Sequence, residues 1–222
     1  MMTNKITALT PQLKNHQRIN VFLDGEFAFG LTRFVAAWLY IGQELDETKI
    51  EQLKKADQIE TAYQRTLNYI NYRDRSVSEV NKYLQKFNLT QQEIEDVINR
   101  LKEINCINDK RFACTWVENR TEFRPRSPRA LKYELHHLGI SDGEIDHAIE
   151  GLDEDQLAIK AASRQATRYA NLEWLVFRKK MYGFLSRRGF SSECATNAIR
   201  KVWAEEIMQA TNINKTSEEV TR

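Results

Sequence analysis

The feature that most constrains the fold of this chain is an internal repeat of about 50 residues. The pattern Arg-x-Arg-Ser at residues 73–76 returns at residues 124–127, and eight apolar positions match at the same offset of 51. A further shift of 50 residues places seven of these eight positions on apolar residues again, and only Arg188 breaks the third copy. One helical unit cannot bury its apolar face alone. The repeat therefore predicts similar units in series.

The shortage of glycine and proline favours helices over a loop-rich β-fold. The chain of 222 residues has 8 glycines and 3 prolines, together about half of the usual share. An all-β sandwich or barrel has to turn roughly every 8–12 residues, yet no glycine occurs between Gly42 and Gly139. We therefore predict a mostly helical protein.

Each copy of the repeat carries signals for the ends of its helices. Ser76-x-x-Glu79 is a capping box, in which the serine oxygen accepts a backbone N–H and the glutamate accepts the N–H of the serine. Asn88 stands where the other copies have Gly139 and Gly189, and these residue types accept the left-handed conformation that ends a helix. Two similar boxes stand at residues 90–93 and 141–144, and helical stretches upstream span residues 62–71, 111–120 and 157–169. Each copy is therefore predicted to contain three helices.

The first 34 residues have the pattern of a small antiparallel sheet. Residues 18–23 and 26–31 alternate polar and apolar side chains, and Asp24-Gly25 lies between them. This is a strong hairpin signal, because both central residues of such a turn need a positive φ. We predict a two- or three-stranded meander that includes the β-prone residues 6–9. An isolated hairpin is barely stable in water, so we expect it to pack on a helix at residues 47–58.

These patterns together predict a mainly α-helical chain with a small β-hairpin or meander at its N-terminus. Apolar stripes at helical spacing would supply the core of each helical unit. The predicted segments are an N-terminal hairpin and helix at residues 1–59, three-helix repeats at residues 60–108, 109–152 and 153–207, and a polar tail at residues 208–222.

No pattern of catalytic or metal-binding residues stands out. The sequence lacks the GxxxxGK[ST] and GxGxxG spacings of phosphate-binding loops. His136 and His137 are neighbours, so on a helix they point about 100° apart and cannot both face one metal. We expect no enzyme activity, no metal and no cofactor.

The sequence also indicates a cytoplasmic protein. No run approaches 18 consecutive apolar residues, and the first ten residues lack the apolar core of an export signal. Cys106, Cys114 and Cys194 are odd in number and unevenly spaced, which is typical of reduced cysteines.

Local charge carries more information than the net charge of +2. Five basic residues and one acid lie between Arg120 and Lys132, and eight basic residues and one acid lie between Lys160 and Arg188. Such clusters on a helical module can bind phosphates or an acidic protein groove. The alternative is a solvated face whose charges pair along the helices. The candidate binding residues are Arg178, Lys179, Lys180, Arg187 and Arg188, then Arg124, Arg126, Arg129 and Lys132, with Arg73 and Arg75 as weaker candidates that flank a helix start.

Several stretches, in the right order, resemble the RecX family of recombination regulators. YRDRSVSEVNKYL from Tyr72 is similar to the start of the family's first repeat, and INCINDKRFACTWVENR from Ile104 resembles its D-[DE]-x-R-F-A signature. FLSRRGF from Phe184 matches its closing element. Asn108 and Asn88 stand where the family usually has an acid and a glycine, and the third repeat has WLVFRKKM in place of the R-x-R-S opening.

The resemblance spans nearly the whole chain and implies three tandem three-helix units in an elongated, curved array. It also implies binding to the recombinase RecA, within the groove of its filament on single-stranded DNA. Such binding modulates ATP hydrolysis and strand exchange, mostly by inhibition, in homologous recombination, DNA repair and the SOS response. We expect a monomer whose basic residues contact acidic RecA surface or DNA. The alternative is a helical module that binds DNA or RNA directly, without RecA, and that binding should weaken steeply with salt.

Overall fold

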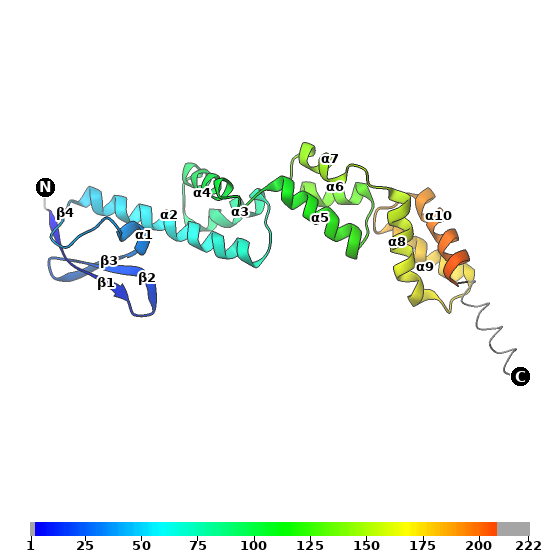
Figure 1. The fold of residues 1–222 in the computed structure, drawn as a ribbon, viewed down its shortest axis with the longest axis horizontal. Helices are drawn as coiled ribbons and strands as arrows, with labels where there is room; N and C mark the ends of the chain where they lie inside the picture. The colour runs from blue at the N-terminus through cyan, green and yellow to red at the C-terminus, as the bar shows by residue number, and fades with distance from the viewer. Residues whose placement is uncertain (1–2, 208–222) are drawn as a thin grey trace, which may run out of the picture. The chain divides into compact units, whose positions relative to one another are not determined.

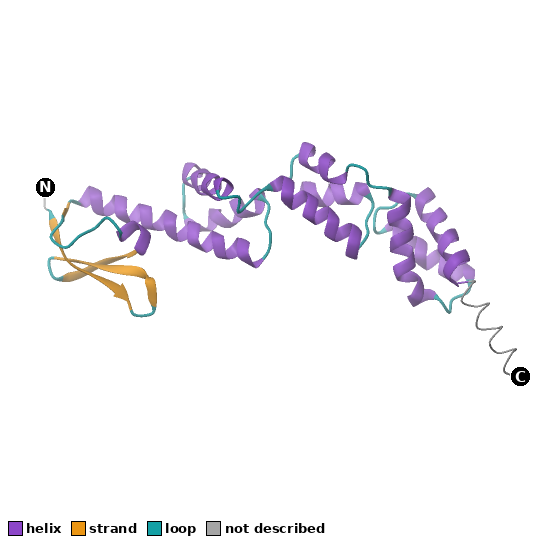
Figure 2. Ribbon diagram, viewed as in Figure 1, coloured by secondary structure: helices purple, strands orange, loops and turns teal. Residues whose placement is uncertain are grey.

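The computed structural model describes residues 3–207, so the predicted polar tail at residues 208–222 lies outside the described residues. The chain divides after Ile107 into two compact units, each of which is described by itself. The first unit holds a small sheet and one three-helix bundle, and the second holds two further three-helix bundles (Figures 1 and 2). The prediction of a mainly helical chain, with three three-helix units after a small N-terminal sheet, is confirmed. The predicted segment boundaries stay predictions.

The N-terminal sheet has four antiparallel strands, one more than the largest meander expected. β1 (Asn4–Gln12), β2 (Asn15–Leu23) and β3 (Glu26–Thr32) follow one another, and the short β4 (Glu44–Leu45) pairs with the start of β1 in the order β3-β2-β1-β4. Asp24 and Gly25 join β2 to β3 with φ values of 49° and 93°, as the hairpin signal predicts. The fourth strand escapes sequence analysis because two residues are too few to show an alternating pattern.

One face of the sheet forms an apolar core with two helices, α1 (Arg33–Ala36) and α2 (Glu47–Tyr72). Ile6, Val21 and Leu31 have no exposed surface, and Ile50 and Leu53 of α2 lie in the same core. The expected packing of the meander on a helix that starts at residue 47 is therefore confirmed.

The helix α2 is continuous over 26 residues, whereas the sequence suggested separate helices at residues 47–58 and 62–71. Neither glycine nor proline interrupts the chain between those stretches, so nothing local ends the first one. The N-terminal half of α2 packs on the sheet, and Ala62, Tyr63 and Ile70 of the C-terminal half pack in the first helical bundle. One helix thus belongs to two cores.

The first bundle is completed by α3 (Val77–Leu84), a 3-10 turn (Gln85–Phe87) and α4 (Gln91–Glu103). Both predicted capping boxes form at the starts of α3 and α4. Asn88 follows the 3-10 turn in the left-handed conformation with φ 52°, as predicted from its place in the repeat. Local polar groups therefore fix the ends of these helices.

The second unit repeats this arrangement twice. Its helices are α5 (Asp109–Phe123), α6 (Pro128–His137), α7 (Asp142–Ile149), α8 (Glu154–Ala166), α9 (Trp174–Ser186) and α10 (Ser192–Val202), with a 3-10 turn (Thr167–Tyr169) after α8 and a π-helical turn (Trp203–Ile207) after α10. The helices α5–α7 share one buried core, and α8–α10 share another. The capping box at Ser141 and the proline at the start of α6 are present as predicted.

The second and third bundles meet at the segment between α5 and α6. The Ser127 N–H donates to the carbonyl oxygen of Arg188 over 3.1 Å, and the Arg188 guanidinium donates to the carbonyl oxygen of Pro125 over 2.9 Å. Gly189 follows with φ 87°, and a Cβ there would lie 2.6 Å from Ser127 Oγ and 2.7 Å from Ala130 Cβ. The glycine that ends α9 is therefore also the point where the two bundles touch.

Replacing Gly189 by alanine should destabilise the second unit. The new methyl group would meet Ser127 and Ala130, and its residue would hold a positive φ, so we expect a loss of about 1–3 kcal/mol in the free energy of unfolding. Urea denaturation followed by tryptophan fluorescence measures this loss. The matched control is Gly143→Ala in α7, where a Cβ meets nothing within 4 Å and stability should stay the same or rise. Equal effects of the two substitutions would contradict the prediction.

Candidate functional site

The basic run Arg178–Lys179–Lys180 lies on the exposed face of α9. Phe177 and Met181 on either side of the run are fully buried in the third core, whereas the run itself lies outside it, with the Lys180 ammonium 5.8 Å from the ring centre of Tyr169. All three are exposed, and none makes an ion pair with a described residue. The run therefore keeps its charge available for a partner.

A hollow of about 180 Å³ lies beside this run, between α9 and α10. Arg178 and Arg200 line it together with the aromatic rings of Trp174 and Tyr182, and none of its described lining residues carries a carboxylate. Two guanidinium groups beside aromatic rings suit an anion that also carries a flat apolar part.

Arg187 and Arg188 end α9 but have different surroundings. Arg187 is exposed, whereas Arg188 is half-buried at the contact between the bundles and lies over the Phe184 ring at 4.4 Å. Burial lowers the pKa of Arg188, and the positive charges of Arg126 and Arg124 lower it further. An arginine stays charged in spite of such a shift, so three guanidinium groups from two sequence clusters lie near one another here.

The second predicted cluster divides into free and paired residues. Arg124 and Arg129 are exposed and make no ion pair with a described residue. Arg126 lies 2.8 Å from Glu134, and Lys132 lies 2.8 Å from Asp146. The hydrogen bond that the Lys132 ammonium donates to Asp146 raises the pKa of Lys132 above its usual value. Half of this cluster therefore already has an acidic partner within the chain.

Arg73 and Arg75 hold the capping glutamate of α3. The Arg73 guanidinium donates to both carboxylate oxygens of Glu79, over 2.6 and 3.2 Å, and Arg75 lies 3.5 Å from the same carboxylate. Burial raises the pKa of Glu79, but the hydrogen bonds from Arg73 and the Ser76 N–H, with both arginine charges, lower it overall. These two weaker candidates thus have a structural role at the start of α3.

The first two bundles differ in the residues that contact these arginines. In the first bundle Tyr69 and Tyr83 stack at 4.2 Å, and Arg75 lies over Tyr69 at 3.9 Å. At the positions 51 residues later, Arg120 and Glu134 form an ion pair, and Arg126 joins it. An aromatic stack in one copy is therefore replaced by an ion pair in the next, which adds one basic and one acidic residue and gives Arg126 an acidic partner.

The structure brings together residues that the sequence separates. We name Arg124, Arg126 and Arg188 the junction cluster, because they meet where the second and third bundles touch. Lys160 and Arg164 of α8 also reach this region, where both bind the carboxylate of Glu122. Such a concentration of positive charge attracts anionic partners.

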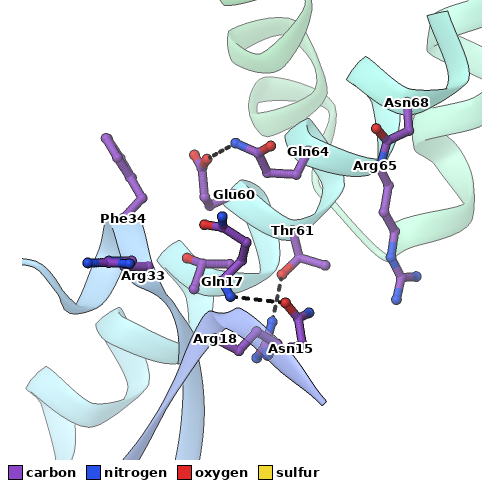
Figure 3. A pocket seen from close by; sticks show the side chains of 11 residues that line it. Asn15, Gln17, Arg18, Arg33, Phe34, Glu60, Thr61, Gln64, Arg65 and Asn68 are labelled. Atoms are coloured by element: carbon purple, nitrogen blue, oxygen red, sulfur yellow. Dashed lines mark hydrogen bonds between the residues drawn. The ribbon is translucent and has the colours of Figure 1, made fainter. Parts of the chain in front are cut away.

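Two features escaped sequence analysis. Tyr72 and Phe123 end the first helix of the first and second bundles and are 88% and 69% exposed. Their offset of 51, directly before the Arg-x-Arg-Ser pattern, is the signal that could have found them. The second feature is a hollow of about 420 Å³ in the first unit, between β2, the end of β3, α1 and α2 (Figure 3). No sequence motif marks it, because its lining comes from four separate elements.

Among residues 3–207, no group of three or more histidine, cysteine or acidic side chains could hold a metal ion. The three cysteines are free. No helix in the same range is long and apolar enough to cross a membrane.

Family models match the chain in four consecutive segments. They are the RecX N-terminal domain at residues 4–46 and the first, second and third RecX three-helix domains at residues 62–101, 108–149 and 153–199. The matched segments contain the sheet and most of each helical bundle.

Curated relatives and solved structures agree with these matches. Regulatory protein RecX of Bacillus pumilus is 31% identical over 203 residues, which cover 89% of this chain and 77% of the relative. Regulatory protein RecX of Listeria monocytogenes is 30% identical over 206 residues, 90% of this chain and 77% of the relative. A crystal structure of regulatory protein RecX aligns with a TM-score of 0.68 at 30% identity, over 86% of this chain and 96% of that one. The crystal structure of RecX from Lactobacillus salivarius aligns with a TM-score of 0.56 at 26% identity, over 66% of this chain and 97% of that one.

Replacing Glu79 by glutamine should test the structural role of Arg73 and Arg75. Because the folded protein lowers the pKa of Glu79, its carboxylate stabilises the fold above the ordinary value of 4.5, and this stabilisation is lost as the pH falls through the lowered value. We expect the Glu79→Gln variant to lose about 1 kcal/mol at neutral pH, and the difference from the unchanged protein to shrink in acid. Urea denaturation at several pH values measures this. If the difference in unfolding free energy between the two proteins stays constant with pH, the structural role given to the Glu79 carboxylate and its two arginines is contradicted.

Proposed function

Because the chain belongs to the RecX family of regulatory proteins, we propose that it regulates the recombinase RecA. It binds RecA and its filament on single-stranded DNA, and it mostly inhibits ATP hydrolysis and strand exchange in homologous recombination, DNA repair and the SOS response. We propose that it acts in the cytoplasm as a monomer, without catalysis of its own. The curated relatives carry the name regulatory protein, which supports a role without catalysis.

The observation that carries this proposal is the set of basic side chains left free on the second and third bundles. The set comprises Arg124, Arg129, Arg178, Lys179, Lys180 and Arg187, which are exposed and make no ion pair with a described residue. Arg126 and Arg188 add positive charge at the junction cluster but also hold in-chain partners. Free guanidinium and ammonium groups bind carboxylates of a protein groove or phosphates of DNA, so they suit both components of a RecA filament.

Removing the basic run of α9 should weaken inhibition of RecA. We expect the concentration that gives half-inhibition of the DNA-dependent ATPase to be about tenfold higher for the triple variant R178A/K179A/K180A than for the unchanged protein. This corresponds to a loss of about 1.4 kcal/mol in binding free energy. The measurement is RecA ATPase activity on single-stranded DNA against protein concentration. The matched control is K49A/K82A/K102A, which removes three exposed lysines of the first unit and should change inhibition little. If excess unchanged protein leaves ATPase and strand exchange unaffected, the proposed function is wrong.

A specific observation favours direct contact with single-stranded DNA as a second candidate function. Phe123 is 69% exposed and lies between Glu122, which Lys160 and Arg164 bind, and the free Arg124. Aromatic rings beside cations bind single strands, because every base can stack on the ring while the cations hold phosphates. Tyr72 has the equivalent position in the first bundle, but its neighbour Arg73 is already paired with Glu79.

Replacing Phe123 by alanine should weaken binding of an oligothymidine without RecA. We expect about fivefold weaker binding, because one stacked base contributes about 1–3 kcal/mol. The slope of the logarithm of the binding constant against the logarithm of the salt concentration should stay the same for Phe123→Ala. Arg124→Ala should reduce the magnitude of this slope by about 0.7, because one phosphate contact is lost. Fluorescence anisotropy across a salt series measures both quantities. Tyr72→Ala is the matched control and should reduce the affinity for the oligothymidine less. An equal loss of affinity in the two aromatic variants would contradict the role of the surrounding charge.

A further inference from the structure

The hollow in the first unit, here called the N-terminal groove, is a second concave surface, and none of its lining residues belongs to the second or third bundle. It has a volume of about 420 Å³, within the usual range of ligand clefts of roughly 300–1,000 Å³. Its walls are the start of β2, the end of β3, α1 and residues 60–68 of α2 (Figure 3). All four elements belong to the first unit, so the groove is formed within one compact body.

The acidic lining residue Glu60, and Asp57 beside the lining residue Arg18, already have partners within the chain. Asp57 of α2 lies 2.8 Å from Arg18 of β2, which also donates to the Thr61 hydroxyl over 3.2 Å. Glu60 is only 4% exposed and lies 2.7 Å from Arg100. These carboxylates are neutralised, so they do not repel an anion in the groove.

Two further arginines keep their charge free. Arg33 of α1 and Arg65 of α2 are exposed on the two sides of the groove, and neither makes an ion pair with a described residue (Figure 3). The Arg65 guanidinium lies 5.8 Å from the Phe87 ring centre, an aromatic contact that leaves its donors available. The groove therefore presents uncompensated positive charge on both sides.

The remaining polar lining consists largely of side-chain amides. The side-chain amides of Gln17 and Asn68 hydrogen-bond to no other described side chain or backbone group. Among the described residues, the Asn15 Oδ1 accepts only the backbone N–H of Gln17. An amide both donates and accepts, which matches the N–H and C=O groups of a peptide main chain. A phosphodiester only accepts, so half of this hydrogen-bonding capacity would go unused against a phosphate backbone.

We propose that the N-terminal groove binds an extended acidic segment of a partner protein. Arg33 and Arg65 bind its carboxylates, and the amides of Gln17 and Asn68 pair with its main chain. This inference does not rest on the proposed function of the basic bundles, because it uses other residues in the other unit.

The test is an NMR titration of the ¹⁵N-labelled full chain with a capped peptide in which aspartate alternates with serine. We expect the side-chain amide signals of Gln17 and Asn68 to shift. A matched peptide with asparagine in place of aspartate should bind much more weakly. The variant R33Q/R65Q should weaken binding of the acidic peptide about tenfold, because charge-assisted hydrogen bonds are lost. The control R178Q/K179Q removes the same charge from α9 and should leave peptide binding unchanged.

Three results would overturn the proposal. They are the absence of shifts at Gln17 and Asn68, an equal loss of binding in R33Q/R65Q and R178Q/K179Q, and displacement of the peptide by an oligothymidine that shifts the same amides. The last result would make the groove a nucleic-acid surface. RecA ATPase inhibition by R33Q/R65Q, measured alongside, separates a failure of the groove proposal from a failure of the proposed function.

Discussion

The first two bundles both depend on a buried serine that caps the start of their second helix. Ser76 and Ser127 have no exposed surface, and each caps its helix by accepting a backbone N–H. Ser127 has a further role, because its own N–H donates to Arg188 of the next bundle and its hydroxyl faces Gly189. The residue that starts α6 therefore also fixes the contact between the second and third bundles.

The third bundle shows what replaces this serine. The equivalent position is Phe177, which is fully buried, and α9 already begins three residues earlier, at Trp174. Phe177 packs against Tyr169, Trp174 and Trp203 in an aromatic core. In the third bundle a buried aromatic ring therefore stands at the position of the capping serine. The Arg-x-Arg pattern before the serine is absent there as well. The two arginines therefore occur only in the copies of the repeat whose second helix has a serine N-cap.

The features predicted correctly from the sequence are those that depend on neighbours along the chain. The capping boxes, the Asp24-Gly25 turn and the left-handed Asn88 are fixed within a few residues, so a short motif is sufficient to find them. The continuity of α2 was missed because the repeat suggested a boundary where no residue breaks the helix.

The state of the basic residues depends on contacts between helices, which short motifs do not reveal. Lys132 forms an ion pair with Asp146 of α7, and the Arg188 guanidinium donates to the carbonyl oxygen of Pro125, 63 residues away. Sequence analysis therefore located the basic clusters but could not separate the free cations from the paired ones. The same holds for the N-terminal groove, whose walls come from four elements.

The shared helix α2 places a constraint on how this chain can evolve. The sheet core holds Ile50 and Leu53, and the first bundle holds Ala62 and Ile70 of the same helix. One residue inserted between these pairs would rotate the sheet by about 100° about the helix axis and move it by about 1.5 Å. The exposed side chains of residues 54–61 can thus vary, whereas Asp57 and Glu60 are held by their ion pairs with Arg18 and Arg100. The number of residues in this stretch cannot change, unless about two whole turns are added or removed at once. Between these two cores a change in length would disrupt the fold more than most changes in composition.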